Sequence, residues 1–141
     1  MQREETKMDL VVDANIFFSV LIKSGKTEEL MFDPALHLFA PEFIFEEFIK
    51  YKNHIIKKTG RTENEFNKLI EILRKKIKTI SNEEIEKFIP KAREICPDKN
   101  DVDYFALALR LNCALWSNYK ELKNQKVVLV YATHELLKIF E

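Results

Sequence analysis

Several acidic residues lie at positions where a carboxylate could bind a metal ion or take part in acid–base chemistry, and Asp13 is the first we consider. It directly follows a continuous apolar run that ends in Val11 and Val12. A carboxylate at the end of a buried strand is costly unless it is paired or coordinates something. Asp13 could equally cap a helix that begins near Ala14, a common role for aspartate. This residue alone leaves the two interpretations open.

Further carboxylates follow at two other places in the chain. Glu47 borders the apolar stripe of a predicted helix, whereas Glu46 shares a face with polar residues and should point to solvent. Asp98, Asp101 and Asp103 open a helix that is otherwise apolar. Capping and the helix dipole favour acids at such a position, but three acids in six residues are more than capping needs.

The residue types around these acids limit the chemistry. The two cysteines and three histidines show no ligand spacing, so a zinc site and a disulfide framework are not expected. Gly25 and Gly60 are the only glycines, which excludes a glycine-rich phosphate loop. Carboxylates without His or Cys indicate a site for Mg²⁺ or Mn²⁺, and metal-assisted phosphodiester hydrolysis is the leading chemistry.

Short apolar runs alternate with helical periodicity, which predicts βαβ units and a three-layer α/β/α sandwich around a mostly parallel sheet. Ligands bind to such a sheet at the carboxyl ends of its strands, so the acids are expected to converge there. One helix should run from Pro41 and Glu42 to a left-handed Gly60, one should begin at Asn82, and one should span 101–111. The five predicted strands are Met8–Val12, Leu36–Ala40, Ile77–Ile80, Ala114–Ser117 and Val127–Tyr131.

Length and composition are those of one globular domain, which we expect over residues 8–141, after a flexible segment at 1–7. The chain has 23 basic residues (lysine and arginine) and 23 acidic residues (aspartate and glutamate), and 46% of its 141 residues are hydrophobic. No apolar stretch is long enough for a bilayer and no signal segment opens the chain. Because the two cysteines indicate no disulfide framework, a reducing, cytoplasmic location is expected. Phe17, Phe18 and Phe32 could contribute to a dimer surface, although core packing explains them equally well.

The zero net charge conceals a basic stretch at 50–78. It carries ten basic residues against three acidic ones, an excess of +7. Most lysine-rich faces are simply solvated, and composition alone favours that interpretation. If RNA binds, this stretch should flank the acidic pocket and hold the phosphate backbone, with Arg74, Lys75 and Lys76 taking part.

Four segments together resemble the PIN domain family of metal-dependent ribonucleases, which includes VapC-type toxins. They are residues 11–15 (VVDAN), 40–48 (APEFIFEEF), 101–109 (DVDYFALAL) and 115–118 (LWSN). The resemblance covers residues from Met8 to the end of the chain, with the segments in the family's order. It implies a five-stranded sheet of order 3-2-1-4-5.

The resemblance also implies roles for individual residues. Asp13, Glu47 and Asp101 would be the catalytic acids and ligands of Mg²⁺ or Mn²⁺, with Asn15, Ser117 and Asn118 as supporting polar residues. The implied activity is endonucleolytic hydrolysis of RNA, leaving a 3′-hydroxyl group. The implied partners are RNA, an antitoxin protein if the chain is a toxin, and a second copy of the chain in a homodimer, with no membrane.

One residue departs from the family pattern. An aspartate is expected after Asn118, and the sequence has Tyr119, a poor ligand for Mg²⁺. Asp103 or Glu121 could substitute, although Asp103 should face away, since two positions along a helix turn a side chain by about 200°. The alternative is therefore a degenerate PIN domain that binds RNA or a protein with little or no cleavage, and a plain α/β module without a nucleic-acid role is the third interpretation.

Overall fold

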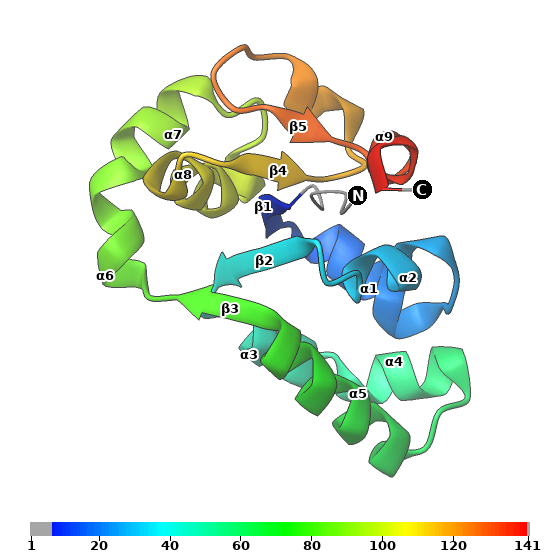
Figure 1. Ribbon diagram of the computed structural model, residues 1–141. Coiled ribbons are helices and arrows are strands. Elements are labelled where there is room, and N and C mark those ends of the chain that lie inside the picture. Colours follow the sequence, from blue (N-terminus) through cyan, green and yellow to red (C-terminus); the bar gives the residue numbers. More distant parts are fainter. Residues whose placement is uncertain (1–6, 141) are drawn as a thin grey trace.

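The computed structural model describes residues 7–140, and its strands form one parallel sheet of order β3-β2-β1-β4-β5. Figure 1 shows β1 in the middle of this sheet, between β2 and β4. The predicted fold class and strand order are confirmed. Of the predicted flexible segment at 1–7, residues 1–6 lie outside the described residues. The strands are β1 Met8–Val12, β2 Leu36–Pro41, β3 Ile77–Ile80, β4 Ala114–Trp116 and β5 Val130–Tyr131.

Both faces of the sheet are covered by helices. Successive residues of a strand point to opposite faces, and Leu10, Val11 and Val12 are all fully buried, so neither face of β1 is open. Figure 1 shows α6, α7 and α8 grouped on one side of the sheet and α1, α2 and α9 on the other. The α-helices are α1 Ala14–Ile22, α2 Lys26–Met31, α3 Ile44–Lys50, α4 Lys52–Thr59, α5 Glu63–Lys76, α6 Asn82–Ile85, α7 Ile89–Ile95, α8 Val102–Leu111 and α9 Thr133–Phe140, and the short 3₁₀ helices are η1 Glu86–Phe88, η2 Lys99–Asp101 and η3 Lys120–Lys123.

The predicted helix from Pro41 to Gly60 is wrong at its start and in its middle. Pro41 belongs to β2, where it pairs with Ile80, so α3 begins only at Ile44. The helix then breaks at Tyr51, whose ring lies 6.1 Å from that of Phe18 on α1. The end at Gly60 is confirmed, because this residue adopts the left-handed conformation with φ of 72°.

Other boundaries also differ from the prediction, by one residue for β2, β4 and α8 and by more for β5. Ser81, not Asn82, caps α6, and its hydroxyl oxygen accepts from the backbone N–H of Glu84 at 3.4 Å. The strand predicted at 127–131 is reduced to Val130 and Tyr131. The side-chain oxygen of Gln125 accepts from the backbone N–H groups of residues 127 and 128, and this segment forms a bend instead of a strand.

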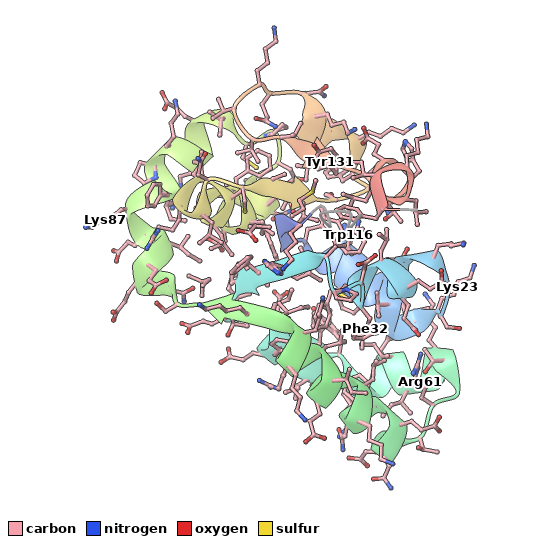
Figure 2. The ribbon with its side chains drawn as sticks, viewed as in Figure 1. Lys23, Phe32, Arg61, Lys87, Trp116 and Tyr131 are labelled. Carbon is pink, nitrogen blue, oxygen red and sulfur yellow. The ribbon has the colours of Figure 1, made fainter. Side chains whose placement is uncertain are left out.

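The core fills the space between sheet and helices. Phe17 is fully buried and stacks on Phe48 with ring centres 4.0 Å apart, so it cannot contribute to a dimer surface. Trp116 lies in the interior (Figure 2), where its indole N–H donates to the Thr133 hydroxyl at 3.0 Å and ties β4 to α9. Within the described chain, none of the helices has the length and apolar character needed to cross a bilayer.

Candidate active site

An acidic cleft of about 460 Å³ opens where β1, β2 and β4 end. These are the carboxyl ends of the strands, the position at which parallel α/β sheets bind ligands. The segments that follow the three strands and the start of α8 supply its walls. The residues that line the cleft are Ala14, Asn15, Phe43, Glu47, Asp98, Asn100, Asp101, Tyr104 and Tyr119.

Asp13 follows the last residue of β1 and directly precedes Ala14 and Asn15, which line the cleft, although Asp13 is not itself among the lining residues. The residue is 2% exposed, and Oδ1 accepts from the backbone N–H of Ile16 at 2.9 Å, so capping of α1, one of the two interpretations left open, is observed. Burial raises the pKa of this carboxyl group, and hydrogen bonds from the Ser117 hydroxyl and from the backbone N–H groups of Ile16 and Asn15 partly oppose that rise. Asp13 is therefore a buried, hydrogen-bonded acid next in sequence to residues that line the cleft.

Asp101 stands at the N-cap position of α8 but does not act as a cap. In the described chain its carboxylate makes no capping hydrogen bond. Burial, followed by the negative charges of Asp13 and Asp98, raises its pKa to about 6. Capping therefore does not explain this acid, which is half-buried beside two others.

Two further acids stand at the edge of the cleft. Glu47 lines it from α3 as an exposed side chain, whereas Glu46 is exposed without lining it, as predicted. Asp98 also lines the cleft, although the sequence identified it only as a helix-opening acid. Its carboxylate accepts from the backbone N–H of Asn100 at 2.9 Å.

The expected supporting residues separate into two groups. Asn15 lines the cleft and the buried Ser117 hydroxyl contacts Asp13, so both adjoin the acids. Asn118 instead accepts from the backbone N–H of Thr133 at 2.7 Å, which caps α9 on another side of β4. Asp103 is not among the residues that line the acidic cleft and lines a different one, which agrees with the expectation that it faces away.

Tyr119 lines the acidic cleft at the place where the family pattern expects an aspartate. Its side chain is 36% exposed, and its hydroxyl donates to Oε2 of Glu121 at 2.8 Å. This hydrogen bond is the main cause that raises the pKa of Tyr119 to about 12. The phenol is therefore neutral, and it engages one of the two carboxylates that could have substituted for the missing aspartate.

Tyr104 lines the cleft, but the sequence did not identify it as a site residue, because an aromatic residue within an apolar helix indicates core packing. It is 4% exposed and packs edge-on against Phe43, with ring centres 6.0 Å apart. Its hydroxyl has no hydrogen-bond partner among the described residues. Burial, and then the negative charges of Glu47, Asp13 and Asp101, raise its pKa, so it remains a protonated donor.

The residues of the cleft fit a hydrated divalent ion. Their donors are carboxylate oxygens, which Mg²⁺ and Mn²⁺ prefer, and among residues 7–140 no lysine or arginine lines the cleft to neutralise them. Across the same residues, no group of three or more His, Cys, Asp or Glu side chains forms a ready-made metal cage. Mg²⁺ commonly keeps several waters and uses only one or two carboxylates, so such an open site is compatible with it.

Most of the basic stretch at 50–78 belongs to the α4–α5 hairpin, with Lys50 at the end of α3 and Lys78 in β3, and Figure 2 places Arg61 in the loop between α4 and α5. Several of its charges have structural partners. Lys76 donates to the carbonyl groups of residues 33 and 36, each at 2.8 Å, and Arg74 lies 4.6 Å from the centre of the Phe45 ring. Lys52 pairs with Glu63 at 2.6 Å. Substituting Arg74 or Lys76 would disturb these contacts as well as any RNA binding, so neither residue is suitable for a test of RNA binding.

Comparisons with known proteins agree with this architecture. The family model of the PIN domain matches residues 11–132 of the chain. The chain therefore belongs to the PIN domain family.

Seven chains of solved structures also match. One of them comes from the crystal structure of VapBC2 from Rickettsia felis bound to a DNA fragment from their promoter, with 14% identity and a TM-score of 0.64. The match covers 89% of this chain and 98% of that chain, and at this identity it shows a shared fold. No curated protein matches.

Proposed function

We propose that this PIN domain is a divalent-ion-dependent endoribonuclease, with Asp13, Glu47 and Asp101 as its catalytic acids and ion ligands. The observation that carries the proposal is the position of the Asp101 carboxyl group, which is half-buried near the negative charges of Asp13 and Asp98. A helix N-cap position usually explains an aspartate, but in the described chain the Asp101 side chain makes no capping bond. Its raised pKa reflects a cost to the metal-free fold that a bound cation would offset.

The acids have different tasks in this proposal. Asp13 would be the fixed ligand, because hydrogen bonds from the Ile16 backbone N–H and from the Ser117 hydroxyl orient its carboxylate. Asp101, at the start of α8, and Glu47, on α3, would complete the set, since both line the cleft. These three acids would hold a divalent ion, which would supply activation of a water molecule for in-line attack on the phosphorus and charge stabilisation of the leaving oxygen.

Tyr119 supports a second candidate, a degenerate PIN domain that binds RNA or a protein without efficient cleavage. Three carboxylates offset the repulsion between two divalent ions less well than four would. The neutral phenol also holds Glu121 in a hydrogen bond of 2.8 Å. We therefore expect weak cleavage that needs Mn²⁺ at high concentration.

We propose three partners in a cytoplasmic setting. RNA would be the substrate, and the α4–α5 hairpin would hold its backbone through exposed charges such as Lys57, Lys58 and Lys68. The fold shared with the VapBC2 structure supports an antitoxin as protein partner, and thus a role in a toxin–antitoxin pair. A homodimer is the third proposal, which analytical ultracentrifugation would test.

A thermal-denaturation titration with Mn²⁺ tests the ion site before any RNA is added. An ion that binds only the folded state at a hundredfold excess over its Kd should stabilise it by about 2.7 kcal/mol. Asp101→Asn should remove most of this gain. A midpoint that does not move with Mn²⁺ would contradict ion binding and leave a domain that binds its partners without metal.

A further inference from the structure

The hydroxyl group of Tyr104 is a buried donor without a partner. Tyr104 is 4% exposed, and no acceptor among residues 7–140 takes its hydroxyl hydrogen. Leaving a buried polar group unsatisfied is unfavourable, and such groups in folded proteins are rare. A phenylalanine would fill the same space beside Phe43 without that cost. The fold itself therefore gives no reason for the hydroxyl.

The surroundings of this hydroxyl contain acceptors that it does not yet reach. Tyr104 lines the acidic cleft together with Glu47 and Asp101. Among the neighbouring charges, that of Glu47 acts most strongly on the phenol, ahead of those of Asp13 and Asp101. Asp13 is already held by hydrogen bonds, whereas Glu47 is an exposed side chain with freedom to change rotamer.

We propose that Tyr104 is a positioning residue for Glu47, whose carboxylate accepts a hydrogen bond from the Tyr104 hydroxyl when the cleft holds a divalent ion. This inference rests on the proposed function. Carboxylates that bind metals are usually oriented by a second hydrogen bond, and losing such a partner typically costs about 10–100-fold in metal affinity. Because Tyr104 is packed in the core and Glu47 is not, the tyrosine would supply the fixed end of the contact.

The test measures Mn²⁺ affinity by electron paramagnetic resonance of the free ion, which needs no catalytic turnover. Tyr104→Phe should weaken binding about tenfold, while the unfolding midpoint of the metal-free protein stays the same or rises. Tyr131→Phe removes a hydroxyl from a tyrosine on β5, outside the cleft, and should change neither quantity.

A double-mutant cycle with Glu47→Gln identifies the acceptor. If the hydroxyl acts through Glu47, Tyr104→Phe should weaken binding less than about twofold in the Glu47→Gln background. An equal loss in both backgrounds would overturn the assignment, and so would wild-type affinity in Tyr104→Phe. Both outcomes leave the proposed ion site intact, whereas wild-type protein that binds no Mn²⁺ would contradict the proposed function as well.

Discussion

The hydroxyl of Tyr119 donates a hydrogen bond of 2.8 Å to Oε2 of Glu121. This contact joins the residue that departs from the family pattern to a carboxylate that could have compensated for it. The phenol lines the acidic cleft without adding charge, and its partner is already engaged. The weakness that we expect in the site is therefore localised to one side chain.

Tyr119→Asp should restore the missing carboxylate. We expect Mn²⁺ affinity and Mn²⁺-dependent cleavage to rise about 10–100-fold, because a direct ligand should contribute at least as much as an outer-shell partner. The side chain is 36% exposed, so the fold should lose little stability. Tyr119→Phe is the matched control, since it releases Glu121 without adding an acid. Equal gains in both variants would show that releasing Glu121, not the new ligand, matters.

Asp101 should make the stability of the metal-free protein depend on pH. Its pKa is about 6 in the fold and near 3.8 in an unfolded chain, so its ionisation costs folding free energy as pH rises between these values. Above pH 6, Asp101→Asn should be more stable than wild type by about 1 kcal/mol after allowance for solvent screening, or about 3 °C. Below pH 4 the two proteins should converge, and saturating Mn²⁺ should reverse their order at pH 7. A variant less stable than wild type at pH 7 without metal would contradict this account.

Glu47 and Glu46 are adjacent, exposed and equally charged, but only Glu47 lines the cleft. Glu47→Gln should weaken Mn²⁺ binding about tenfold in calorimetric titration, while Glu46→Gln should leave it unchanged. Both variants should unfold at the same temperature without metal. The placement of Glu47 is wrong if the two substitutions weaken binding to the same degree.

The α4–α5 hairpin should carry the salt-dependent part of RNA binding. Replacing the exposed Lys57, Lys58 and Lys68 with glutamine should weaken binding to single-stranded RNA and reduce the slope of log K against log salt by about 2. A control triple variant at the exposed Lys87, Lys126 and Lys138 makes the same change of charge outside the hairpin, and Figure 2 shows Lys87 on the other side of the molecule from Arg61. Binding is measured by fluorescence anisotropy. An equal loss of RNA affinity in the two triple variants would show that the hairpin has no special role and that surface charge in general attracts the RNA.

The architecture was predictable because buried parallel strands appear as short apolar runs, and because polar residues that follow them must meet at one edge of the sheet. Boundaries that depend on tertiary contacts were not predictable. The break at Tyr51 coincides with its packing near Phe18, and the shortening of β5 depends on a side chain, that of Gln125.

The candidate site was predictable to a similar extent. Asp13 directly follows a strand, Asp101 precedes a helix, and Glu47 borders the apolar stripe of one, and sequence alone can identify such positions. Tyr104 was hidden because an aromatic residue in an apolar helix indicates core packing, and only the structure shows its hydroxyl without a partner among residues 7–140. Asn118 follows the family pattern in sequence, yet its amide oxygen caps α9.

The most direct test of the central claim is a cleavage assay with a single-stranded RNA oligonucleotide, in EDTA, Mg²⁺ or Mn²⁺. It should compare wild type, Tyr119→Asp, Asp101→Asn and the control Glu46→Gln. We expect no cleavage in EDTA, slow cleavage by wild type and Glu46→Gln in Mn²⁺, faster cleavage by Tyr119→Asp, and none by Asp101→Asn. Cleavage that persists in EDTA or in Asp101→Asn, or its absence from both wild type and Tyr119→Asp in Mn²⁺, would contradict a divalent-ion-dependent ribonuclease site in this cleft.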